Sequence, residues 1–115
     1  MSELKELQST EELSQIWDQS DDKPVLLFKH STTCPISAGA FKEYQEFLSN
    51  SDEGLEGYMV KVIENRDVSN QIADQTSVKH ESPQVFLIKD KQVLWNTSHS
   101  KITSNSISEA LESAK

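Results

Sequence analysis

The chain has 115 residues, of which 35% are hydrophobic, and it carries a formal net charge of −8. This length predicts one compact domain over residues 1–115. The acidic charge argues against nucleic acid or an anionic membrane as a partner, because both require a basic face. No stretch approaches the roughly 20 apolar residues of a membrane span, and the first six residues do not resemble a signal peptide. A lone cysteine agrees with a reducing compartment, so we expect a cytoplasmic protein.

The first quarter of the chain predicts a short strand, a helix and a buried strand. The short strand is expected near residues 4–7. Ser9 and Glu12 have the spacing of a capping box, and apolar residues recur at helical intervals as far as Trp17, which we expect in the core. Residues 24–28 are continuously apolar between turn residues, which is typical of a strand buried on both faces.

A second helix is expected to begin at Pro35, because a missing N–H costs nothing at the first helical position. Its apolar residues form one stripe, opposite a charged face. The members of this stripe are Ile36, Ala40, Phe41, Tyr44, Phe47 and Leu48.

The rest of the chain predicts a loop, a strand, a weaker helix, a hairpin and a last helix. We expect a loop over 49–57, a strand over 58–63 and a helix that ends near Thr76. The hairpin strands are expected over 85–88 and 93–95, and the last helix over 107–114. Asp67 or Ser69 is expected to cap the weaker helix. The short spacing of the last two strands predicts an antiparallel pair.

This element order predicts an α/β fold with a central mixed β-sheet flanked by helices on both faces. Strands joined through helices are expected to be parallel neighbours, and the hairpin adds an antiparallel edge. The only cysteine, Cys34, follows a strand at its carboxyl end, where open α/β sheets place their sites.

Cys34 stands where a strand gives way to a helix, between Thr33 and Pro35. The unpaired N–H groups and the positive dipole end of a helix stabilise a thiolate over a thiol. The alternative is a small buried hydrophobic side chain, which is common for a free cysteine. Ser37 occupies the place of the second cysteine of a Cys-x-x-Cys motif, so the chain cannot close an internal disulfide. Its redox partner must therefore come from elsewhere.

Three segments carry a resemblance to a known family. The element order, with a cysteine opening a helix and a proline before the hairpin, resembles the thioredoxin-like superfamily. More specifically, Thr-Cys-Pro-Ile-Ser at 33–37, His-Glu-Ser-Pro-Gln at 80–84 and Trp-Asn-Thr-Ser-His at 95–99 resemble the monothiol bacilliredoxins of low-GC Gram-positive bacteria. The resemblance implies a thiol–disulfide oxidoreductase that removes bacillithiol from S-bacillithiolated proteins.

The family's mechanism implies that Cys34 attacks the bacillithiol sulfur, releases the protein thiol and becomes bacillithiolated itself. Free bacillithiol, as co-substrate, would regenerate Cys34, and a separate nicotinamide-dependent flavin reductase would reduce the bacillithiol disulfide. The expected partners are therefore S-bacillithiolated proteins, bacillithiol and, indirectly, that reductase. No tightly bound cofactor is expected, and we expect a monomer.

Six residues are expected to support Cys34. They are Thr33, Pro35, Ser37, His80, Ser82 and Pro83. The Ser37 hydroxyl could donate to the thiolate or satisfy a backbone N–H, and the sequence leaves both open. Only about 5–6% of X–Pro bonds in folded proteins are cis. The resemblance nevertheless implies a cis Ser82–Pro83 bond in a loop that packs beside Cys34.

The histidines, at positions 30, 80 and 99, lack the spacing of metal ligands, so no metal site is expected. Lys29 or His30 could add positive potential near Cys34, and His80 is the better candidate for contacting substrate.

Two other functions remain open from the sequence. One is an iron–sulfur cluster carrier like the monothiol glutaredoxins, although those proteins usually carry Gly and Phe where Pro35 and Ile36 stand here. The other is a non-catalytic thioredoxin-like stress protein.

Overall fold

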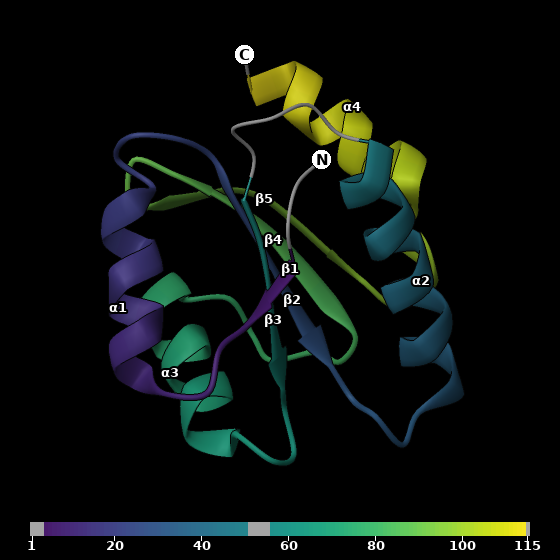
Figure 1. Cartoon of the computed structure of the whole chain (residues 1–115), viewed down its shortest axis with the longest axis horizontal. Helices are drawn as coiled ribbons and strands as arrows, with labels where there is room; N and C mark the ends of the chain where they lie inside the picture. The colour runs from purple at the N-terminus through teal and green to yellow at the C-terminus, as the bar shows by residue number, and fades with distance from the viewer. Residues whose placement is uncertain (1–3, 51–55, 115) are drawn as a thin grey trace.

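The computed structural model describes residues 4–50 and 56–114 (Figure 1). The strands are β1 (Leu4–Glu6), β2 (Val25–His30), β3 (Glu56–Lys61), β4 (Gln84–Lys89) and β5 (Gln92–Ser98). The helices are α1 (Thr10–Gln19), α2 (Pro35–Asn50), α3 (Arg66–Thr76) and α4 (Ser104–Ala114), with a single 3-10 turn η1 (His99–Lys101) before α4. In this described part of the chain, no helix combines the length and the apolar character needed to cross a membrane.

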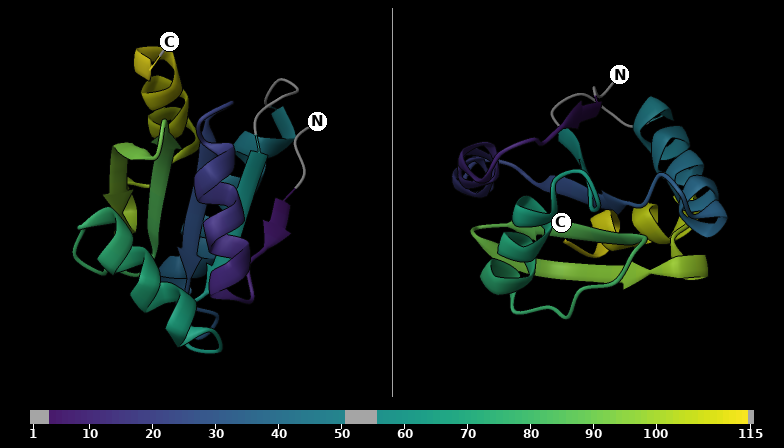
Figure 2. Two further views of the ribbon diagram at one scale, coloured as in Figure 1. Left: turned by 90° about the vertical axis from the view of Figure 1, so that its left-hand side faces the viewer. Right: turned by 90° about the horizontal axis from the view of Figure 1, so that it is seen from below.

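The strands form one mixed sheet in the order β1-β3-β2-β4-β5. β1, β3 and β2 are mutually parallel, whereas β4 and β5 run antiparallel to their neighbours. Helices α2 and α4 cover one face and α1 and α3 cover the other, as the views in Figure 2 show. The expected α/β sheet with helices on both faces is therefore confirmed.

The position of β4 corrects one expectation about topology. We expected it beside β3, in parallel, because a helix joins the two strands. It lies instead beside β2 and antiparallel to it, with Lys29 opposite Gln84. The segment 77–83, which follows α3, returns the chain to the sheet edge where β2 and β3 end, so β4 starts from that edge. A helical connection makes two strands parallel only when it spans the whole length of the sheet.

The central strand β2 separates two apolar cores. All six of its residues are buried, because it pairs with β3 and β4 and is covered on both faces. Leu26 and Phe28 face α2 and α4, while Val25 and Leu27 face α1 and α3. The continuous apolar run in the sequence follows from this double burial.

The helix boundaries differ in part from those expected. The Glu12 N–H donates to Ser9 Oγ over 3.2 Å, so the expected cap of α1 is confirmed. The expected caps of α3 are wrong. The helix begins at Arg66, so Asp67 lies in its first turn and Ser69 is buried within the helix.

The expected loop over 49–57 is shorter than the sequence suggested, since α2 continues through Asn50 and β3 begins at Glu56. The central part of that loop, 51–55, lies outside the described residues. Strand β3 also ends at Lys61, two residues before the expected end.

The apolar stripe of α2 is confirmed except at its first member. Ile36 is 57% exposed, so it belongs to the surface rather than to the core. Trp17 is only partly buried and packs at the margin of the core between α1 and α3.

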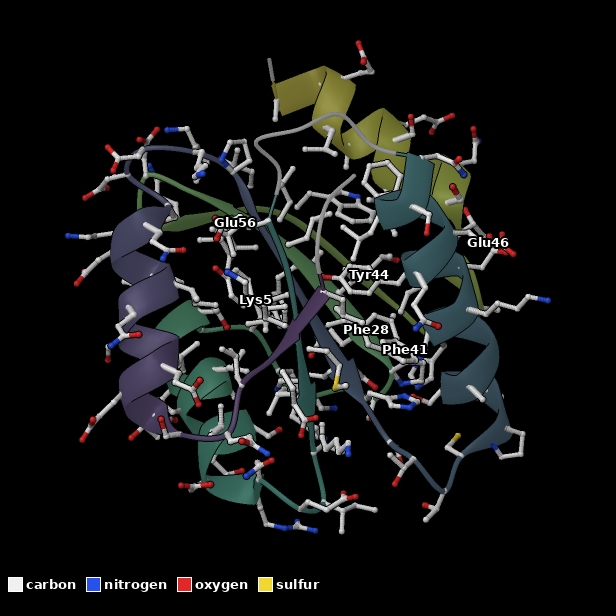
Figure 3. The ribbon with its side chains drawn as sticks, in the orientation of Figure 1. Lys5, Phe28, Phe41, Tyr44, Glu46 and Glu56 are labelled. Atoms are coloured by element: carbon white, nitrogen blue, oxygen red, sulfur yellow. The ribbon has the colours of Figure 1, made fainter. Side chains whose placement is uncertain are left out.

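Tyr44 fastens α2 to the sheet. Its hydroxyl accepts the Tyr58 N–H (3.1 Å) and lies within donating distance of the carbonyl oxygens of Tyr58 (2.9 Å) and Leu26 (3.1 Å). Its ring stacks on Phe28 at 5.0 Å between centroids, and Phe41 completes this aromatic group between α2 and the sheet (Figure 3). One fully buried hydroxyl thus joins α2 to two strands.

The Tyr44→Phe substitution is expected to lower the free energy of unfolding by about 1–3 kcal/mol, because it removes a hydroxyl from buried backbone partners. Urea denaturation of this variant and of Tyr58→Phe provides the comparison. The Tyr58 hydroxyl is only partly buried, where it meets the side chains of Gln19 and Glu56, so its removal should cost less. Equal stability of Tyr44→Phe and the wild type would contradict the claim that hydrogen bonds of the Tyr44 hydroxyl stabilise the packing of α2 on the sheet.

Candidate active site

Three chain segments meet at one edge of the sheet. β2 and β3 end there and β4 begins there, because β2 and β3 are parallel and β4 is antiparallel to β2. Cys34 follows β2, and the segment 77–83 precedes β4. The Val62 N–H donates to the His30 carbonyl oxygen over 3.0 Å, which extends the contact of the first two segments beyond the strands. The topology therefore brings Cys34, His80 and Pro83 to the same edge.

Cys34 is partly exposed and immediately precedes α2. Its carbonyl oxygen accepts the Ala38 N–H over 3.1 Å, so this residue begins the hydrogen bonding of the helix. Pro35 occupies the first helical position, as expected, and Thr33 is exposed on the other side. The thiol is thus neither sealed in the core nor distant from a helix terminus, which is the placement that favours a reactive sulfur.

Ser37 is fully buried in the first turn of α2. Its Oγ accepts the Ser31 N–H over 2.9 Å and lies 2.8 Å from His30 Nδ1. Of the two roles that the sequence left open, the structure shows the one in which Ser37 satisfies a backbone N–H. This hydroxyl ties the end of β2 to the start of α2, on either side of Cys34.

His30 is buried and held in place by two neighbours. Its ring stacks on Phe41 at 4.5 Å between centroids, and its Nδ1 faces Ser37 Oγ. Burial lowers the pKa of His30, and Lys61 lowers it further while Glu64 opposes the shift. His30 is therefore neutral at pH 7, with the Ser37 hydroxyl donating to its Nδ1. A neutral imidazole adds no formal charge near Cys34, so the expected positive potential from His30 is not supported.

Lys29 is fully buried on the opposite face of β2, toward α1 and α3. Its Nζ lies 3.0 Å from His80 Nδ1 and 5.9 Å from the centre of the Phe86 ring. Burial lowers the pKa of Lys29 to about 8. The sequence did not indicate this contact, because the expected strand stopped at residue 28, whereas β2 continues to His30.

The segment before β4 contains the expected cis Ser82–Pro83 bond. The Pro83 carbonyl oxygen accepts the His99 N–H over 3.1 Å. The buried Gln84 side chain donates to the Lys79 carbonyl oxygen (3.1 Å) and accepts the Glu81 N–H (3.2 Å). These bonds hold the segment in place. Lys79, Glu81, Gln84 and His99 were not expected at the site: the bonds of Gln84 join residues close together in the chain, whereas the bond between Pro83 and His99 depends on the pairing of β4 with β5.

Ser82 differs from its neighbours in one respect. Its Oγ is buried and makes no hydrogen bond with any residue that the structure describes. The His99 imidazole lies nearby in the same region of the fold, with Nε2 3.8 Å from Glu81 Oε2. Within residues 4–50 and 56–114, no three or more His, Cys, Asp and Glu side chains are grouped to hold a metal ion.

A thioredoxin-type sheet with a partly exposed cysteine opening the first helix after the central strand defines a thioredoxin-fold thiol oxidoreductase. Solved structures agree: a candidate oxidoreductase with a thioredoxin fold is 37% identical and has a TM-score of 0.85, with 94% of this chain and 93% of that chain covered. Fasciola hepatica thioredoxin shares the fold, with 15% identity, a TM-score of 0.77, and 96% of this chain and 99% of that chain covered. Mitochondrial thioredoxin 3 of Saccharomyces cerevisiae also shares it, with 13% identity, a TM-score of 0.74, and 96% of this chain and 94% of that chain covered. Residues 5–107 match the family model of the monothiol bacilliredoxin BrxC, and the chain belongs to this family.

The Ser37→Ala substitution is expected to lower the free energy of unfolding by about 1–3 kcal/mol, because the Ser31 N–H and His30 Nδ1 both lose their partner. Thermal or urea unfolding measures the loss. Ser108→Ala is the matched control, since Ser108 is exposed on α4. If the two variants were equally stable, Ser37 would not tie β2 to α2.

The Lys29→Met substitution is expected to change how stability depends on pH. The unfolded chain binds a proton at Lys29 up to about pH 10.5 and the folded chain only up to about pH 8, so the free energy of unfolding rises between these values. Removing the amine should flatten this rise by an amount on the order of 2 kcal/mol. Urea denaturation of both proteins at several pH values in this window measures it. Parallel pH profiles would contradict the burial of an ionisable amine.

Proposed function

We propose that this chain is a bacilliredoxin enzyme that removes bacillithiol from S-bacillithiolated proteins, with Cys34 as the nucleophile. The observation that carries the proposal is one partly exposed thiol at the start of α2, with a buried serine in the place of a second cysteine. Membership of the monothiol bacilliredoxin family supports bacillithiol as the thiol that is transferred.

The first step is a thiol–disulfide exchange. The Cys34 thiolate attacks the bacillithiol sulfur of the mixed disulfide, a new S–S bond forms, and the target protein leaves as its thiolate. The electron pair of the broken S–S bond departs with the target sulfur, which then takes a proton from water. The target is reduced, and the oxidising equivalent now resides in the disulfide between Cys34 and bacillithiol.

The second step needs an external thiol. Ser37 has no sulfur, and its hydroxyl is already bonded to Ser31 and His30, so it cannot resolve the adduct. A second, free bacillithiol molecule attacks, as its thiolate, the bacillithiol sulfur of the adduct; the S–S bond to Cys34 breaks, Cys34 leaves as its thiolate and bacillithiol disulfide forms. A separate nicotinamide-dependent flavin reductase in the cytoplasm completes the cycle. In this proposal the protein works as a monomer, with bacillithiol as co-substrate and without a tightly bound cofactor.

The residues around Cys34 supply access and alignment. Cys34 is partly exposed between the exposed residues Thr33 and Pro35, and in this proposal the segment with Ser82 and Pro83 offers backbone groups to the bound mixed disulfide. The Ser82 hydroxyl is buried and has no hydrogen-bond partner among the described residues, which agrees with a group that acquires its partner when substrate binds.

The test compares the wild type with Cys34→Ser on a reporter protein carrying bacillithiol on one cysteine. Without free bacillithiol, the wild type should release about one equivalent of reporter thiol per chain and gain the mass of bacillithiol on Cys34. With free bacillithiol, it should turn over repeatedly. Cys34→Ser should do neither.

Equal release by the wild type and Cys34→Ser would contradict the proposal. Visible absorbance after anaerobic reconstitution with iron and sulfide, together with no release of bacillithiol, would instead indicate a cluster carrier.

A further inference from the structure

The contact between Lys29 and His80 has no place in the exchange chemistry described above. Lys29 reaches from β2 to the segment before β4, where its Nζ meets His80 Nδ1 at 3.0 Å. The Ser69 hydroxyl of α3 lies 3.4 Å from the same nitrogen. Both neighbours of Nδ1 can donate a hydrogen bond, and a protonated lysine can only donate.

This arrangement determines which imidazole nitrogen carries the proton. With Lys29 protonated, Nδ1 must accept, so the single proton of a neutral His80 resides on Nε2. Partial desolvation, Lys29 and Arg66 lower the pKa of His80, while Glu81 opposes them. These are the charged groups that face His80 from β2, from α3 and from its own segment. His80 therefore remains a neutral donor through Nε2 rather than an imidazolium.

The same groups favour an anion beside His80. Two of the three charged neighbours, Lys29 and Arg66, are cations in a chain whose net charge is −8. His80 itself is exposed, and its Nε2 makes no hydrogen bond with the residues that the structure describes. An N–H donor near two cations matches a carboxylate acceptor. Bacillithiol carries such groups in its malate moiety.

We propose that Lys29 holds His80 as an Nε2–H donor and that this N–H group binds a malate carboxylate of bacillithiol during exchange. The carboxylate part of this inference rests on the proposed function. Lys29 is then a positioning residue, which acts through His80, and His80 is a binding residue that distinguishes bacillithiol from thiols without a carboxylate at that place. Burying the Lys29 amine opposes folding at neutral pH, because its charge is desolvated. In this proposal the amine contributes to substrate recognition by orienting His80.

The tautomer is tested directly by long-range ¹H–¹⁵N correlation spectra of the histidine rings in the native protein at neutral pH. The expected spectrum shows His80 neutral, with a protonated Nε2 and a bare Nδ1. In Lys29→Met, the share of the Nε2–H form should fall toward that of a free histidine and the pKa of His80 should rise toward its ordinary value. A protonated Nδ1 in the wild type, or an unchanged His80 in Lys29→Met, would overturn the role of Lys29.

Binding is tested with two substitutions that separate the nitrogens. His80→Asn keeps an acceptor near the place of Nδ1 but has no distal donor, whereas His80→Gln keeps a donor near the place of Nε2. His80→Asn should raise the KM for the bacillithiolated reporter about 10-fold with little change in kcat, as expected for the loss of a hydrogen bond to a charged group. His80→Gln should recover part of this loss.

A second reporter carries the cysteinyl glucosamine analogue of bacillithiol, which lacks the malate. The wild type should show a higher KM for this reporter, and His80→Asn should treat the two reporters alike. Equal discrimination by the wild type and His80→Asn would overturn the carboxylate contact. If the wild type releases neither adduct, the proposed function fails, and the spectra still decide whether Lys29 sets the His80 tautomer.

Discussion

The antiparallel pairing of β2 with β4 is the constraint on which the site depends. It places Lys29 opposite Gln84, so the chain leaving β2 toward Cys34 and the chain entering β4 through Pro83 meet at one edge. Both strands are buried over nearly their whole length, and a shift of register by one residue would turn their side chains to the opposite core. The apolar cores therefore fix the relative position of these two segments.

Ser37 shows how the fold accommodates a single thiol. The Ser37 hydroxyl accepts the Ser31 N–H and faces His30, so it joins the end of β2 to the start of α2 by hydrogen bonds. A cysteine at this position could instead form a disulfide with Cys34. The hydrogen bonds of Ser37 hold the backbone on both sides of Cys34 while leaving the sulfur partly exposed. The proposed dependence on an external thiol thus rests on the same side chain that stabilises the turn.

The sequence predicted most elements because their patterns are local. The cap at Ser9, the start of α2 at Pro35 and the buried run of β2 each depend on residues close together in the chain. The placement of β4 beside β2 could not be predicted in this way, because it depends on how the segment 77–83 returns after α3. The exposure of Ile36 was also missed: helical spacing places it on the apolar stripe, but its side chain is 57% exposed in the folded protein.

The candidate site was predictable at Cys34 and less so around it. Motif positions indicated His80 and Pro83, whereas nothing local indicated that Lys29 would be buried against His80, because a lysine at the end of a strand is ordinarily exposed. Such contacts arise only when the sheet is assembled.

We claim above all that the fold presents the Cys34 thiol, partly exposed at the start of α2, as a reactive nucleophile. The most direct measurement is the rate at which iodoacetamide alkylates Cys34 at about pH 6.5, in the native protein and in the same protein unfolded in urea. The account predicts faster alkylation of the native protein. Protection of Cys34 until the protein unfolds would contradict it.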